Sequence, residues 1–397
     1  MDILLEQSER LVAATNLNFK RYLFNTIHWN SRLIGIKGAR GTGKTTMLLQ
    51  WLKEQRLPAS KATYFSLDDL YFTKNTLKDT VEKYYKSGGT ILVLDEVHKY
   101  KNWSQEIKNC YDFFPELKII FTGSSIIDLS RQHGDLSRRV LMYELNGLSF
   151  REYLQMMNVI NINTVTLPDL LLNTFDVRNS IDNAFRPLAH FNEYLQFGYY
   201  PFTVQDTTTV HQRINQLVRT IVEMDMAELN DFDIRNATKM LQLIYIIAQQ
   251  VPFKPNISAL ALKTGIHRNS LNNYLYYLEQ AKIITLLYPP GNSTANLPKP
   301  DKIYLNNTTL LHALAELQAE IGAVRETFFV SQVKPFYNIN APKQGDFLVA
   351  DKYTFEIGGK TKSRKQIEGV ENAWIVKADI ETPQNKSLPL WMFGLLY

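Results

Sequence analysis

Residues 38–45 of this chain read Gly-Ala-Arg-Gly-Thr-Gly-Lys-Thr, a combination that can hold phosphate and a divalent cation. The stretch fits the Walker A pattern at every fixed position. Its glycines let backbone N–H groups close around phosphate oxygens, and the N-terminus of the following helix adds positive charge there. We expect Lys44 to reach the β- and γ-phosphates of ATP and the Thr45 hydroxyl to ligate Mg²⁺. The residues expected to bind the nucleotide are Gly38, Ala39, Arg40, Gly41, Thr42, Gly43, Lys44, Thr45 and Thr46.

A pair of acids, Asp95 and Glu96, follows the apolar run of residues 91–94. Asp95 is placed to hold Mg²⁺ through water, and Glu96 to polarise the attacking water. Two solvated acids at the end of a strand are the common alternative. The Walker A stretch upstream favours the metal site at Asp95, and a Glu in the next position indicates hydrolysis as well as binding.

A polar turn, residues 122–125, ends another apolar run. In P-loop ATPases with an extra strand between the two Walker strands, a polar residue at this place senses the γ-phosphate. Ser124 and Ser125 are both candidates, and we assign Ser124 to the cofactor site. The alternative is a serine-rich turn that caps the next helix.

Apolar runs that alternate with helical patterns position these residues. Continuous apolar runs are typical of buried parallel strands, and their alternation with helices predicts an α/β domain whose sheet is covered on both faces. The predicted strands are residues 32–37, 62–66, 90–94, 117–122 and 140–145, and residues 44–55 are predicted to form the helix after the glycine-rich turn.

The bulk properties are those of a soluble globular protein of more than one domain. The chain has 397 residues, of which 45% are hydrophobic and 21% charged, and its formal net charge of +5 permits a nucleic-acid partner without arguing for one. Cys110 is the only cysteine, so no intrachain disulfide can form. The acidic N-terminus is no signal peptide, and no run of about 18 apolar residues could span a membrane. These features predict a cytoplasmic protein.

Beyond the Walker A stretch, several segments carry a resemblance to a known family over nearly the whole chain. They are residues 95–100 (Asp-Glu-Val-His-Lys-Tyr), 102–106, 122–125, 144–153 and 198–201. In these segments the chain resembles prokaryotic AAA-type ATPases with a P-loop domain, a winged helix and a degenerate restriction-endonuclease-like domain of unknown function. The resemblance implies an ATPase with ATP and Mg²⁺ as cofactors.

The chain departs from the family pattern near Arg139. The family's Gly-Arg before the fifth strand is Arg138-Arg139 here, and Gly147 replaces a proline. The resemblance implies that Arg139 acts as a finger on the ATP of a second copy of the chain, so we count it as catalytic with Lys44 and Glu96. A surface arginine paired with an acid is the alternative.

Two further residues of the resemblance, His98 and Trp103, have no chemistry that demands them. Trp103 is interpreted as packing at a helix start. His98 is a structural contact or a relay near the γ-phosphate. No cysteine or histidine stands at ligand spacing from it, so we predict no metal site there.

The second half begins with helical patterns and then predicts a winged helix. Residues 256–266 and 267–278 form a helix-turn-helix pattern, and residues 282–288 and 302–305 its wing strands. A DNA-binding helix would present Arg268, Asn269, Asn272 and Asn273. A structural spacer or protein contact is the alternative, because the helix has a single arginine.

The end of the chain predicts a nuclease-like domain that lacks its lysine. Glu326, Asp346 and Glu356 stand where restriction-endonuclease-like folds hold Mg²⁺. Gly358 occupies the lysine position, and Lys360 lies about 7 Å further along an ideal strand. We therefore expect no catalysis from this domain.

The fold class is α/β: a P-loop AAA-type parallel sheet, a helical and winged-helix region, and a small nuclease-like domain. The expected boundaries are residues 1–155, 156–310 and 311–397. The favoured function is an ATPase that couples hydrolysis to conformational change and macromolecule binding. A DNA-binding regulator with ATP as a structural ligand and an ATP-driven nuclease are the alternatives.

Overall fold

The computed structural model describes residues 1–125, 136, 138–204, 206–228, 232–291, 299–315, 318–384 and 387–397, apart from the side chain of Asn269. The chain divides into two compact units, Met1–Asn146 and Gly147–Tyr397. The three-domain division, with boundaries after residues 155 and 310, remains a prediction.

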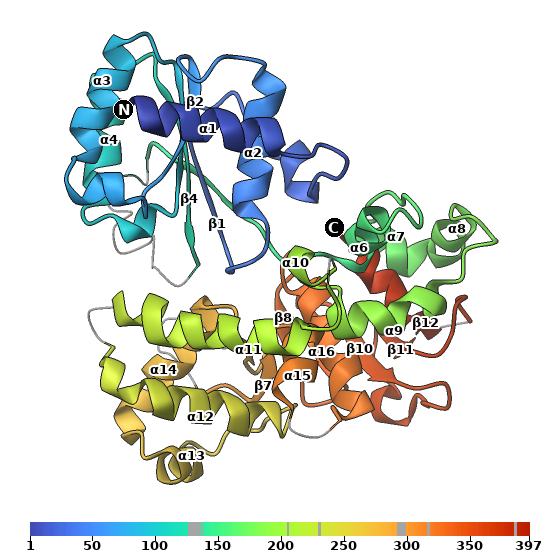
Figure 1. The fold of residues 1–397 in the computed structure, drawn as a ribbon. Coiled ribbons are helices and arrows are strands. Elements are labelled where there is room, and N and C mark those ends of the chain that lie inside the picture. Colours follow the sequence, from blue (N-terminus) through green and yellow to red (C-terminus); the bar gives the residue numbers. More distant parts are fainter. Residues whose placement is uncertain are drawn as a thin grey trace. The chain divides into compact units, whose positions relative to one another are not determined.

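The first unit is built on five strands: β1 (Leu33–Gly38), β2 (Ala62–Ser66), β3 (Ile91–Asp95), β4 (Lys118–Ser124) and β5 (Leu141–Glu144). They form a fully parallel sheet in the order β2-β3-β4-β1-β5. Strands β1, β2 and β4 of this sheet are labelled in Figure 1. This is the strand order of a P-loop NTPase, with β4 as the extra strand between the two Walker strands β1 and β3. All five predicted strands are present, and their bounds differ from the prediction by no more than two residues.

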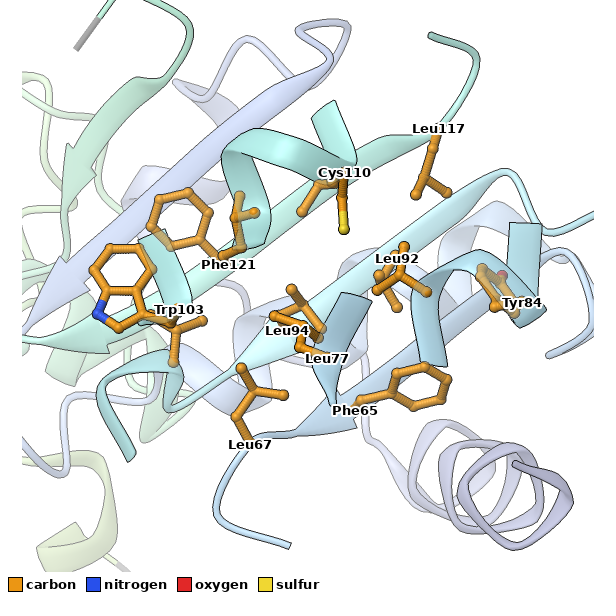
Figure 2. Close-up of a cluster of buried hydrophobic side chains, with 14 of the residues drawn as sticks. Phe65, Leu67, Leu77, Tyr84, Leu92, Leu94, Trp103, Cys110, Leu117 and Phe121 are labelled. Atoms are coloured by element: carbon orange, nitrogen blue, oxygen red, sulfur yellow. The ribbon is translucent and has the colours of Figure 1, made fainter. Parts of the chain in front are cut away.

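Alternate residues of the central strands enter two separate cores. Leu92 and Leu94 of β3 belong to one core and Val93 to the other. The first core includes side chains of α3 (Leu77–Lys86) and α4 (Trp103–Phe113), and Figure 2 shows ten of its labelled residues around the strands. The second includes side chains of α2 (Lys44–Gln55). The sheet is therefore covered on both faces, which explains its continuous apolar strands.

The first unit has further helical elements outside the sheet and the two cores' main helices. Helix α1 (Asp2–Ala14) contacts α2 and the edge strand β2. The described residues of this unit also form the 3₁₀ helices η1 (Tyr22–Asn25), η2 (Leu70–Thr73) and η3 (Val97–Lys99).

The second unit begins with helices, the first of which starts at a capping box of Ser149 and Glu152. The helices are α6 (Phe150–Met156), α7 (Leu167–Leu172), α8 (Thr174–Asn179), α9 (Pro187–Phe197), α10 (Pro201–Val204), α11 (Val210–Thr220) and α12 (Ala237–Ala248), with short helical turns at η5 (Ile221–Asp225), η6 (Met226–Glu228) and η7 (Ile234–Asn236).

Two helices and an antiparallel pair of strands follow over the residues predicted to form the winged helix. They are α13 (Ile257–Thr264), α14 (Arg268–Gln280) and the antiparallel pair β6 (Ile284–Leu287) and β7 (Lys302–Leu305). The expected buried face of α14 is present, since Leu271, Leu275 and Leu278 are buried.

A mixed five-stranded sheet ends the chain in the order β12-β11-β10-β9-β8. Strand β10 is antiparallel to β9 and parallel to β11. The elements of this region are α15 (Thr308–Leu314), α16 (Ile321–Val333), β8 (Ile339–Asn340), β9 (Phe347–Val349), β10 (Tyr353–Gly358), η9 (Lys365–Ile367), β11 (Ala373–Lys377), β12 (Ser387–Pro389) and η10 (Leu390–Leu395). No helix in the described part of the chain is long and apolar enough to cross a membrane.

Candidate nucleotide site

The glycine-rich turn between β1 and α2 has the backbone that a phosphate loop requires. Gly41 and Gly43 have positive φ angles of 82° and 92°, which favour glycine, and α2 begins at Lys44 directly after them. A Cβ atom at Gly38 would collide with the carbonyl oxygen of Leu145. The turn therefore depends on its glycines for two different reasons, conformation and close approach.

The lysine of the turn lies against the loop that it is expected to serve. Lys44 Nζ is buried and donates to the carbonyl oxygens of Gly38 (2.9 Å) and Ala39 (3.1 Å). Thr42 Oγ1 also donates to Ala39 O (2.9 Å). The side chains thus hold the loop in shape, and Lys44 can exchange loop carbonyls for phosphate oxygens.

The carboxylate of Asp95, at the end of β3, accepts hydrogen bonds from several residues of the site. Its Oδ2 accepts from Thr45 Oγ1 (2.6 Å) and from Tyr64 OH (2.8 Å), and its Oδ1 accepts from Thr122 Oγ1 and from the N–H of Glu96 (3.1 Å). The two residues predicted to ligate Mg²⁺, Thr45 and Asp95, are therefore in contact. A hydroxyl beside a carboxylate is a donor set that suits this hard cation.

Two members of this cluster, Tyr64 and Thr122, were not predicted. Each lies near the carboxyl end of a strand that pairs with β3. Phe65 of β2 and Phe121 of β4, the neighbours of these two residues in the chain, both pair with Leu94 of β3. Burial, with the Asp95 charge as a second cause, raises the pKa of Tyr64, so its phenol stays a donor. A polar side chain near the end of a predicted strand is a weak signal for such a residue. The register of the sheet is needed to show that these two reach Asp95.

Glu96 has an unusual backbone and a histidine neighbour. Its φ of 51° is rare for a residue other than glycine, and its N–H also donates to Thr122 Oγ1 (3.2 Å). His98 Nε2 lies 3.2 Å from Glu96 Oε2, and Ser124 donates its N–H to His98 Nδ1 (3.2 Å). Burial, together with the charges of Lys99, Lys44 and Arg40, lowers the pKa of His98 to about 3. His98 is therefore neutral at physiological pH and joins Glu96 to the predicted sensor residue Ser124.

Arg139 makes a two-pronged ion pair with Asp112 of α4. Its Nε and Nη2 donate to the two carboxylate oxygens at 2.9 Å and 3.1 Å, and both side chains are partly exposed. Within one chain this is the surface pair considered as the alternative. The catalytic role of Arg139 in a second copy remains a prediction.

Arg21 supports the phosphate loop from a distant part of the sequence. It is buried, Nη1 donates to the carbonyl oxygen of Thr42, and Nη2 donates to that of Asn146 (2.7 Å). No motif signals this residue, because it stands well upstream of the Walker A stretch.

The sheet order and the glycine-rich turn define the first unit as a P-loop NTPase. Residues 30–154 match a family described as AAA domain, and residues 188–321 match a domain of unknown function (DUF8612). The chain therefore carries an AAA-type P-loop ATPase domain followed by a domain of unknown function.

A similar protein is an uncharacterized protein of Methanocaldococcus jannaschii, 29% identical over 372 residues, which cover 84% of this chain and 77% of the relative. Among solved structures, the ADP complex of Hsp104 from S. cerevisiae is 13% identical with a TM-score of 0.35, covering 70% of this chain and 40% of Hsp104. AMPPCP-bound DnaA from Aquifex aeolicus is 14% identical with a TM-score of 0.27, and the match covers 65% of this chain and 85% of DnaA. These TM-scores are low, and the fold assignment rests on the sheet order and the domain match.

In the second unit, the predicted DNA-contacting residues of α14 are exposed where the structure describes them. Arg268, Asn272 and Asn273 face solvent, whereas the side chain of Asn269 lies outside the described part. Gly265, with a φ of 64°, makes the turn between α13 and α14. DNA binding by this helix, and the winged-helix assignment itself, remain predictions.

The three acids of the region predicted to be nuclease-like each have a partner from this unit. Tyr304 OH donates to Glu326 Oε2 (2.5 Å), the N–H of Ile357 donates to Asp346 Oδ2 (2.8 Å), and Lys362 Nζ pairs with the buried Glu356. Burial raises the pKa of Glu326 and of Glu356, and the charge of Asp346 raises both further.

The cation at Glu356 is thus Lys362, which no motif indicated. The backbone N–H of Lys360, the lysine considered from the sequence, donates to Asp379 Oδ2 (3.2 Å). Over the described residues, no three Asp, Glu, His or Cys side chains are arranged to hold a metal ion.

Proposed function

We propose that this chain binds ATP with Mg²⁺ at the turn between β1 and α2 and hydrolyses the ATP. The observation that carries the proposal is the contact between Thr45 Oγ1 and Asp95 Oδ2 at 2.6 Å, with Glu96 next in the chain. Bound Mg²⁺ would supply charge neutralisation at the phosphates. Thr45 and Asp95 hold it, Lys44 binds the β- and γ-phosphates, and Glu96 takes a proton from the attacking water.

The remaining assigned residues complete the site in this proposal. The backbone of residues 38–43 and the start of α2 at Lys44, Thr45 and Thr46 bind the phosphates, because free N–H groups at a helix N-terminus favour anions. Ser124 reports the γ-phosphate. Arg139 acts on the nucleotide of a second copy in a homo-oligomer.

The test compares binding with turnover in three proteins. Glu96→Gln should bind ATP as the wild type does but hydrolyse it about 10²- to 10⁴-fold more slowly, because the amide cannot accept the proton. Lys44→Ala should lose ATP affinity in isothermal titration. The matched control is Glu82→Gln, a partly exposed acid that pairs with Lys86 on α3 and should leave turnover unchanged.

Two outcomes would contradict the proposal. Wild-type affinity in Lys44→Ala would mean that the turn is not a nucleotide site. ATP binding without any turnover in the wild type would favour the regulator that uses ATP as a structural ligand.

ATP turnover is proposed to change the arrangement of the chain and so to control binding of a macromolecule. The partner is open, and DNA at α14 is one candidate because Arg268, Asn272 and Asn273 are exposed there. Glu96→Gln trapped with ATP is the right bait, since it stays in the ATP state. Recovery of the same molecule with Lys44→Ala would show that capture does not depend on ATP.

A further inference from the structure

His98 is placed between the proposed general base and the end of the sensor strand. After Glu96 the chain turns tightly through η3, and the N–H of Lys99 donates to Glu96 O at 2.9 Å. The turn brings the imidazole of His98 back beside the Glu96 side chain, two positions earlier. The His98 side chain is fully buried, whereas that of Glu96 is 29% exposed.

The hydrogen bond from β4 fixes which ring nitrogen carries the proton. Because the Ser124 N–H donates to His98 Nδ1, that nitrogen is an acceptor. A neutral imidazole then has its only N–H at Nε2. Burial lowers the pKa of His98 and keeps the ring in this neutral form.

The Nε2–H group has one evident acceptor. It is buried and makes no aligned hydrogen bond among the described residues, and Glu96 Oε2 lies 3.2 Å away. A small rotation of the partly exposed Glu96 carboxylate would align the two. A buried donor that lacks a hydrogen bond costs free energy, so a hydrogen bond from His98 Nε2 to Glu96 would stabilise the site.

We propose that His98 is a positioning residue, which donates from Nε2 to Glu96 and aims its carboxylate at the attacking water. In this arrangement the imidazole holds one carboxylate oxygen of Glu96, and the other oxygen accepts the proton of the attacking water. Because the Ser124 N–H donates to Nδ1, the position of the Glu96 carboxylate depends on the position of the end of β4. This inference rests on the proposed ATP hydrolysis by Glu96.

The alternative is that His98 only fills space beneath the site. Substitution of His98 by each of the two amide residues distinguishes this packing role from the positioning role. His98→Asn places an oxygen near the position of Nδ1 and keeps the contact with Ser124, but it cannot reach Glu96. His98→Gln places an NH₂ group near the position of Nε2 and restores the donor to Glu96. The matched control is His28→Asn, because His28 is exposed and outside the site.

The measurements are kcat, ATP affinity and thermal unfolding of the full chain. We expect His98→Asn to lower kcat by about tenfold to a hundredfold, because misplacing a catalytic group is costly, with little change in Kd for ATP. His98→Gln should recover much of the loss, and His28→Asn should match the wild type. In a Glu96→Gln background, His98→Asn should have no further effect on turnover, because the group that it positions is already lost.

The outcomes separate this inference from the proposed function. A wild type that hydrolyses ATP while His98→Asn is equally fast would refute the positioning role alone. Equal losses of kcat and of thermal stability in His98→Asn and His98→Gln would also refute it, since that result describes a packing residue. A wild type without ATP turnover would refute both.

Discussion

Single residues in the nucleotide site are fixed by several partners at once. Asp95 accepts hydrogen bonds from side chains on α2, β2 and β4, so three elements set the position of one carboxylate. Such over-determination also explains how Glu96, the next residue, can keep a positive φ of 51°.

The buried imidazole of His98 should make stability depend on pH. Its pKa is about 3 in the folded protein against 6.5 ordinarily, so below pH 6.5 only the unfolded chain takes up this proton. The contribution of His98 is complete above pH 6.5 and is lost as the pH falls toward 3, at about 1.4 kcal/mol per pH unit.

The comparison variant for this prediction is His98→Asn. On lowering the pH from about 7.5 to 5, the melting temperature of the wild type should fall more than that of His98→Asn, since the asparagine cannot take up the proton. Scanning calorimetry measures both. Equal pH dependence in the two proteins would show that His98 titrates normally.

At the level of elements, the phosphate loop is held by its neighbours in space. Arg21, just before η1, bonds the carbonyl of Thr42 in the loop and that of Asn146 after β5. Leu145 also donates to Lys37 O at 2.8 Å, next to the place where Gly38 has no room for a Cβ atom. Residues directly after β5 and directly before η1 therefore hold the phosphate loop in position.

Removing this clamp should cost stability and ATP affinity together. Arg21→Ala leaves two carbonyl oxygens without their donor, and we expect the unfolding free energy to fall by about 2–4 kcal/mol. ATP affinity should fall as well, because the loop is less well ordered before binding. Arg10→Ala is the control, since Arg10 is exposed on α1 and pairs with Glu6, which is also exposed.

Urea titration and calorimetric titration with ATP measure the two effects in Arg21→Ala. A loss of stability with wild-type ATP affinity would mean that Arg21 serves the fold but not the loop.

At the level of the whole molecule, one question is whether two copies cooperate at one nucleotide. Arg139 is held by Asp112 of its own chain, but exposed pairs are worth only about 0–1 kcal/mol, so a phosphate could compete. Arg139→Ala and Lys44→Ala should each be inactive alone. Their mixture should regain some ATP turnover, because each supplies what the other lacks.

The control for the mixing experiment is Asp112→Asn, which removes the negative charge that Arg139 faces on α4 and should remain active. A mixture without recovered turnover would leave Arg139 as the partner of Asp112 in its own chain.

A second question for the whole molecule is whether the nuclease-like region cuts nucleic acid. Glu356 is paired with Lys362, and Glu326 with Tyr304, so these acids are already partnered within the protein. We expect no cleavage of supercoiled, linear or single-stranded DNA or of RNA with Mg²⁺ or Mn²⁺, with or without ATP. Asp346→Ala combined with Glu356→Ala should leave ATP turnover largely intact.

Cleavage by the wild type that disappears in this double variant would reverse the interpretation. It would make an ATP-driven nuclease the favoured function.

The sequence alone determined the local parts of the nucleotide site. The turn of residues 38–45 and the five strands are encoded in contiguous residues, because glycine conformations and apolar runs act over short distances. The sequence also assigned Thr45 and Asp95 to the same magnesium ion, and the structure adds that the two side chains are in direct contact.

The distant side chains that complete the sites are identified by the folded structure and not by the sequence. Tyr64 reaches Asp95 across 31 positions, and Arg21 reaches Asn146 across 125, so no pattern of spacing could pair them. Lys362 meets Glu356 because the chain turns after β10, where an ideal extended strand had pointed to Lys360. The proton of His98 is likewise placed by a backbone N–H at the end of β4. Sheet register, chain reversal and burial create these contacts, and all three exist only in the folded protein.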